Sequence, residues 1–71
     1  MRRTLPAEIM LAVGDRSFSD DRAGDLVYIT GCVLEHDANG ADAALRSALV
    51  ILAAHCVQWT NHLDSNGQEA A

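Results

Sequence analysis

Residues 41–63, ADAALRSALVILAAHCVQWTNHL, are the most apolar part of the chain and decide its fold. Within them, the run 48–57 is interrupted only by His55. Apolar residues recur at steps of three and four, which is the spacing of one face of an α-helix. The middle turns are apolar almost all round, so we expect a long helix that is buried on several sides.

The segment before this helix, residues 19–35, also has a helical pattern. Ser19 can act as an N-cap, and Asp20 and Asp21 then fall in the first turn, where the helix dipole favours negative charge. The apolar residues that follow at helical spacing predict a core-facing stripe of Ala23, Leu26, Val27, Thr30, Val33 and Leu34.

Residues 26–34, LVYITGCVL, are rich in β-formers and give a competing interpretation. As a strand they would pair with residues 9–13 in a small ββα unit. We favour the helix because the capping residues fit only a helix and because two strands are a poor platform for so apolar a helix. On a helix, Gly24 and Gly31 share one face and would let another helix approach closely.

The remaining segments predict the organisation of a single domain. Residues 1–18 form an arm and connector, with a short helix at 6–13 that Gly14 ends. A polar break at 36–40 contains the turn dipeptide Asn39-Gly40. Residues 64–71 are polar and are expected to be a disordered tail. We therefore predict an all-α fold: a helical hairpin at 19–63 that dimerises into a four-helix arrangement.

The chain is short for its apolar content. It has 71 residues, 49% of them hydrophobic, and a lone core of this size is marginal. The middle of the long helix carries more apolar surface than one hairpin covers. We therefore expect a homodimer, and we place at its interface Leu49, Val50, Ile51, Leu52, Ala54 and Val57.

The charge of the chain excludes several classes of partner. Ten acidic residues face five arginines, and the net charge is −5. Nucleic-acid binding and adhesion to anionic membranes both need clustered positive charge, so we expect neither. The apolar segment 9–13 is too short for a signal-peptide core, and no run reaches the ~18 apolar residues of a membrane span. We expect a cytoplasmic protein with reduced cysteines.

One face of the long helix carries side chains that could do chemistry. His55, Trp59 and His62 are separated by steps of four and three, and Cys56 lies beside them. They are interpreted as the wetter end of a packed interface, because local ligand pairs such as Cys-x-x-Cys are missing. Adjacent residues on a helix point about 100° apart, so Cys56 and His55 do not form a nucleophile–base pair. We expect no catalytic residue, metal or cofactor.

Arginine, methionine and aromatic side chains are enriched in protein–protein interfaces. On this basis the residues nominated for contact with a partner protein are Arg2, Arg3, Leu5, Met10, Tyr28 and Trp59.

Three segments give the chain a recognisable layout: MLAV (10–13), SDDRAGDLVYITGCVLEH (19–36) and RSALVILAAHCVQWTNHL (46–63). This layout resembles that of short helical-hairpin proteins of pseudomonads and their bacteriophages, over residues 10–63 and by residue type only. Some of those proteins are dimeric inhibitors of host regulators such as quorum-sensing activators. The resemblance implies a non-enzymatic regulator or inhibitor that acts on an unidentified bacterial host protein. Residues 26–33 are rich in β-formers and so depart from the layout of those proteins. The resemblance assigns no role to any residue of this chain.

Three other functions fit parts of the pattern. A nucleic-acid-associated hairpin is opposed by the charge of −5. A metal- or pH-responsive regulator would use His55, His62 and Cys56. A structural subunit of a larger assembly would use the apolar helix as its contact surface.

Overall fold

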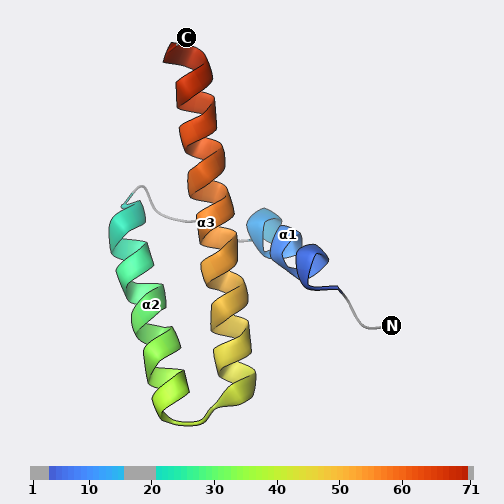
Figure 1. Ribbon diagram of the computed structural model, residues 1–71, viewed down its shortest axis with the longest axis vertical. Helices are drawn as coiled ribbons and strands as arrows, with labels where there is room; N and C mark the ends of the chain where they lie inside the picture. The colour runs from blue at the N-terminus through green and yellow to red at the C-terminus, as the bar shows by residue number, and fades with distance from the viewer. Residues whose placement is uncertain (1–3, 16–20, 71) are drawn as a thin grey trace.

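The computed structural model describes residues 4–15 and 21–70, with side chains described over 4–14 and 21–65. In these ranges the chain forms three α-helices and no strand: α1 (Leu5–Asp15), α2 (Arg22–Ala38) and α3 (Asp42–Ala70) (Figure 1). The prediction of an all-α fold is confirmed. The strand alternative for residues 26–34 is wrong, because these residues lie in the middle of α2. Their β-propensity is outweighed by the capped helix start and by packing on α3.

The start of α2 is fixed by Asp21. Its Oδ1 accepts a hydrogen bond from the backbone N–H of Gly24 at 3.0 Å, and so satisfies one of the free donors of the first turn. We expected Asp21 inside the first turn and Ser19 as the cap. Asp21 is itself the cap, and Ser19 and Asp20 lie outside the described residues.

The connection between α2 and α3 is a Schellman motif. The backbone N–H of Ala41 donates to the carbonyl of His36 at 3.0 Å, and that of Gly40 donates to the carbonyl of Asp37 at 3.1 Å. Gly40 has φ +67°, a left-handed conformation that glycine adopts without strain. The break that we predicted at 36–40 is therefore shorter than expected, because α2 continues to Ala38.

Two glycine-to-alanine changes are expected to have opposite effects. Gly40→Ala should lower the free energy of unfolding by about 1 kcal/mol, because a Cβ is disfavoured at positive φ. Gly31→Ala should raise it by about 0.5–1 kcal/mol, because Gly31 is helical and an added Cβ would meet no atom within 4 Å. Urea unfolding followed by circular dichroism measures both. Equal effects of the two changes would contradict the left-handed turn.

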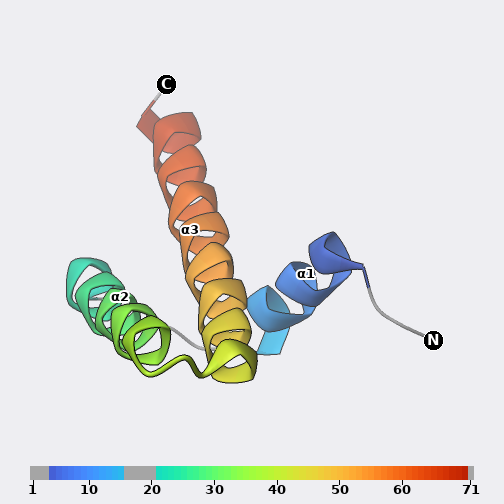
Figure 2. The same ribbon diagram turned by 60° about the horizontal axis from the view of Figure 1, so that its bottom comes forward.

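Helices α1 and α2 pack on α3 and, among the described residues, not on one another. Figures 1 and 2 show them on opposite sides of α3, whose C-terminal turns extend beyond both. The extents of 46 × 32 × 16 Å describe a flat, open arrangement. Its radius of gyration is 13.7 Å, whereas a compact domain of this length has about 11 Å.

The core is small and lies along α3. Among the described residues, the ones with buried side chains are Ile29, Ala48, Ala54 and His55. On α2, Ile29 is flanked by the half-buried Leu26 and Val33, and these three side chains face α3.

The apolar stripe predicted on α2 is partly wrong. Leu26 and Val33 belong to the buried side, but Val27 and Leu34 are 73% and 64% exposed. Two further members of the predicted stripe are also exposed, namely Ala23 and Thr30. The cause is that α2 carries apolar residues on two sides, and their spacing alone does not show which side meets α3.

Both ends of the predicted organisation differ from the structure. α1 runs from Leu5 to Asp15 and includes Gly14, which we expected to end it. α3 continues as helix through 64–70, the part of the chain that we expected to be a disordered tail. Each added residue of a formed helix gains a backbone hydrogen bond, and Gln68, Glu69 and Ala70 are good helix formers.

Candidate functional site

His55 holds α3 to the start of α2 from inside the fold. Its side chain is 1% exposed, and its Nε2 lies 3.0 Å from the carbonyl oxygen of Arg22. Because a carbonyl oxygen only accepts, Nε2 carries the hydrogen and donates it. The ring also meets Trp59 edge-on, with centroids 5.7 Å apart and an interplanar angle of 67°. His55 is thus an interior structural contact, and the interpretation of this face as the wetter end of a packed interface is wrong for His55 itself, although the exposed His62 agrees with it.

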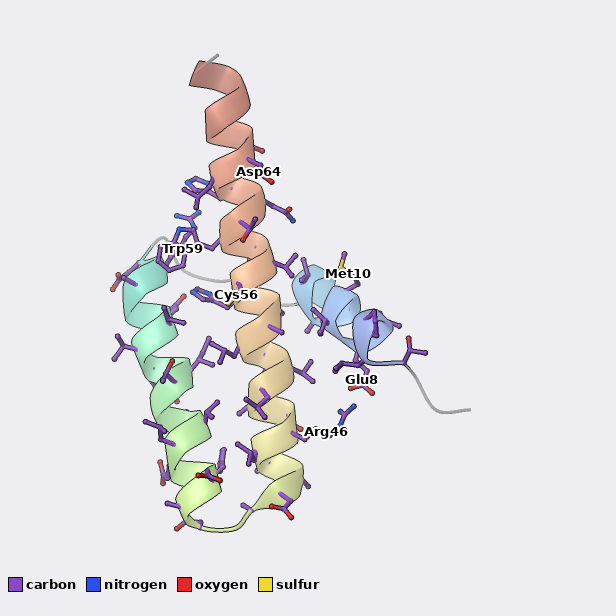
Figure 3. All side chains as sticks on the ribbon, in the orientation of Figure 1. Glu8, Met10, Arg46, Cys56, Trp59 and Asp64 are labelled. Carbon is purple, nitrogen blue, oxygen red and sulfur yellow. The ribbon has the colours of Figure 1, made fainter. Side chains whose placement is uncertain are left out.

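The other three side chains of the predicted His55–His62 group are less buried than His55. His62 and Cys56 are exposed, and Trp59 is half-buried beside His55. Figure 3 shows Trp59 between α3 and the start of α2. Among the described residues, no three His, Cys, Asp or Glu side chains lie close enough to hold one metal ion.

Two polar contacts hold α1 against α3. The Nε2 of Gln58 donates to the carbonyl of Val13 at 2.8 Å, and so satisfies one of the free carbonyls at the end of α1. Near the other end, Arg46 Nη1 donates to Glu8 Oε2 at 2.6 Å, and Nη2 donates to Oε1 at 3.2 Å (Figure 3). The hydrogen bonds that Arg46 donates to Glu8, and then the negative charge of Glu8, raise the pKa of Arg46 above its ordinary value, so the guanidinium stays charged.

An open apolar cavity of about 230 Å³ lies between α1 and α3, beside this ion pair. Leu5 and Ile9 line it from α1. Leu49, Val50 and Ala53 line it from α3, together with Arg46. The cavity could accept an apolar side chain from another molecule, with a charged group of that molecule next to Arg46.

The outward side of α2 is also apolar. Val27, Gly31 and Leu34 are separated by steps of four and three and so lie on one face; we call these three residues the outer α2 face. Val27 and Leu34 are mostly exposed, and the space over Gly31 is open. Tyr28 flanks this face and is 74% exposed.

A second exposed row runs along α3. Leu49, Cys56 and Leu63 are seven residues apart and therefore lie close to one line on the helix; we call them the α3 row. Leu49 is 46% exposed and Leu63 58% exposed, and Cys56 is exposed as well. Together with Leu45, Leu52 and Trp59 they alternate at steps of four and three, which is the seam of a coiled coil.

The structure does not gather the nominated partner-binding residues into one patch. Leu5 and Met10 are exposed on α1, whereas Tyr28 is exposed on α2, on the opposite side of α3. Trp59 packs on His55, and Figure 3 shows Met10 far from it. Arg2 and Arg3 lie outside the described residues.

The residues nominated for the dimer interface surround α3. Leu49 is exposed, whereas Val50, Ile51, Leu52 and Val57 are half-buried. Ala54 is 0% exposed, so its side chain packs inside the single chain and not on a second copy. Consecutive residues of a helix point in different directions, which is why this set does not form one surface.

One segment of α3 is a candidate membrane span. The segment Asp42–Ser65 has 24 residues and is long and apolar enough to cross a membrane, by length and composition only. Of its most apolar window, 17% is buried inside the chain. Core helices of soluble proteins can pass the same test, so this finding is weak evidence for a membrane location.

Comparison of the chain with models of known protein families, with curated proteins and with solved structures gives no match.

Sequence reasoning placed Leu49, Cys56 and Leu63 on the apolar stripe of the long helix but did not show that they form an exposed row, and it did not find the cavity or the contacts of Glu8 and Gln58. The seven-residue spacing of Leu49, Cys56 and Leu63 was a signal that could have revealed the row. The contact of Glu8 with Arg46 joins residues 38 positions apart, and that of Gln58 with Val13 joins residues 45 positions apart. No local sequence pattern shows such pairs.

Proposed function

We propose that this protein is a small, non-enzymatic regulator or inhibitor that acts as a cytoplasmic homodimer by binding a bacterial host protein, such as a transcriptional regulator. In this dimer, the α2–α3 hairpins of two copies form a four-helix arrangement. The resemblance to hairpin proteins of pseudomonads and their phages suggests this class of target.

The observation that carries the proposal is the outer α2 face. Val27 and Leu34 are large apolar side chains exposed for more than half of their surface, and Tyr28 adds an exposed aromatic ring. Burying each of them in a partner's groove would contribute about 1.5–3 kcal/mol. An amphipathic helix laid into an apolar groove is a common mode of protein recognition.

The aqueous location in this proposal is supported by the polar residues of α3. Arg46, His55 and Gln58 all lie within Asp42–Ser65. Such side chains are costly in the hydrocarbon part of a bilayer.

The test compares capture of host proteins by three forms of the purified chain. Wild type is expected to retain a transcriptional regulator from bacterial lysate, and the double variant Val27→Glu/Leu34→Glu is expected to lose it. The matched control Ala43→Glu/Ser47→Glu adds the same charge at exposed positions of α3 and should retain it. Binding is then measured with the purified regulator by calorimetry.

Two results would contradict the proposal. One is retention of the same proteins by wild type and by the outer-face variant. The other is turnover of a substrate by the isolated chain, together with no reproducible binding.

A further inference from the structure

The α3 row is symmetric about Cys56. Leu49 and Leu63 lie seven residues on either side of it, or about 10 Å along the helix. In a two-fold symmetric pair of helices, a residue beside the axis meets its own copy. If Cys56 lies beside the axis of an antiparallel pair, each Leu63 comes next to Leu49 of the other copy.

The two ends of the row differ in shape in a complementary way. Leu49 borders the open cavity of about 230 Å³ between α1 and α3. Leu63 is 58% exposed on the turns of α3 that extend beyond α1 and α2 (Figure 1). Antiparallel pairing therefore brings a protruding side chain to an apolar cavity at both ends, whereas parallel pairing brings cavity to cavity.

The charges beside the row support the same orientation. Arg46 and Asp64 are 18 residues apart, which is five helical turns, so they lie on the same side of α3. Both are exposed. Antiparallel pairing about Cys56 places Arg46 within about two residues, or ~3 Å along the axis, of Asp64 of the other copy. Arg46 also pairs with Glu8 of its own chain, so Asp64 of the other copy would be a second carboxylate beside it. Parallel pairing leaves Arg46 of one copy about five helical turns from Asp64 of the other.

The chain exposes more surface than a compact protein of its mass. A compact folded monomer of 7.6 kDa exposes about 4,300 Å², whereas this chain exposes 5210 Å². The excess, about 900 Å², is surface that the open arrangement of the helices leaves exposed and that a second copy could cover.

We infer that two copies of this chain pair antiparallel along the α3 row, with Cys56 beside the two-fold axis and Leu63 of each copy in the α1–α3 cavity of the other. This inference rests on the homodimer of the proposed function and specifies its contact surface. The outer α2 face takes no part in the pairing and stays open for the host protein.

The first experiment measures the dimer in solution by light scattering and by dilution. Wild type is expected to be a dimer, and Leu63→Glu should weaken dimerisation by about 100-fold or more, because it places two charges in apolar cavities. The control Asn61→Glu adds the same charge on the opposite side of α3 and should leave dimerisation unchanged. Circular dichroism of each variant verifies that its helices remain formed.

The second experiment reads the orientation with a short thiol-reactive cross-linker. Wild type and Cys32→Ser should be cross-linked as dimers through Cys56, and Cys56→Ser should not. In a background without either native cysteine, Leu49→Cys and Leu63→Cys should each fail to cross-link alone. Mixing the two, with one carrying a mass tag, should give the mixed dimer.

The outcomes separate the two levels of the proposal. A monomer at all concentrations overturns both the homodimer and the α3 pairing. A dimer that Leu63→Glu leaves intact, or that Leu49→Cys cross-links to itself, overturns the antiparallel pairing and leaves the homodimer standing. Capture of the host protein tests the outer α2 face independently.

Discussion

Replacing Ala54 by glutamate is expected to lower the free energy of unfolding by more than about 3 kcal/mol, because the change adds a charged group where the native side chain is 0% exposed. The core contains few other buried side chains that could compensate. Urea unfolding at a fixed protein concentration measures the effect, since dimer dissociation is linked to unfolding. A loss of this size is a large fraction of the stability of so short a chain, so the midpoint of the urea transition should fall sharply.

The matched control is Ala43→Glu, on the same helix. Ala43 is exposed and lies in the first turn of α3, where negative charge is favourable. Its unfolding free energy should stay within about 0.5 kcal/mol of wild type. If Ala54→Glu is as stable as this control, then Ala54 does not pack inside the chain.

Truncating His55 to alanine is the second change with a large expected effect, a loss of about 2–4 kcal/mol. The variant removes both the hydrogen bond to the Arg22 carbonyl and the edge-on contact with Trp59, and it leaves a cavity. Because Trp59 is the only tryptophan, its fluorescence should shift toward that of a solvent-exposed indole. Denaturant unfolding followed by this fluorescence measures both effects.

Two further variants separate the causes of this loss. His55→Phe keeps an aromatic ring beside Trp59 but has no donor for the carbonyl, so it should lose only about 1–2 kcal/mol. His62→Ala removes an exposed histidine of the same helix and should have a small effect. Equal losses for His62→Ala and His55→Ala would show that burial does not distinguish the two residues.

The helices were predictable because strong local signals mark them. The apolar run 48–57 lies in a segment with helical spacing that is too long for an ordinary strand, and Asn39-Gly40 can make the turn that the Schellman motif uses. The helix start was less certain, because Ser19, Asp20 and Asp21 are three successive capping residues. Local sequence does not decide which of the three accepts the hydrogen bond from the first turn.

The orientation of the helices was not predictable by the same means. On α2, Val27 and Ile29 are both β-branched and apolar, yet one is 73% exposed and the other 6%. Their difference depends on which side of α2 meets α3, and that is decided by packing over the whole interface. The cavity could not be predicted for the same reason, because it forms only where α1 packs against α3.

The way α1 is attached also affects the order in which contacts can form. α2 and α3 meet across a short turn, whereas Glu8 reaches Arg46 over 38 residues and Val13 reaches Gln58 over 45. Closing a loop of this length costs about 2 kcal/mol more chain entropy than closing a turn of four residues. Once the α2–α3 hairpin has formed, however, Arg22 lies beside His55, so α1 can dock on the hairpin across a much shorter effective loop. Undocking of α1 would leave the α2–α3 contacts in place, because among the described residues α1 does not touch α2.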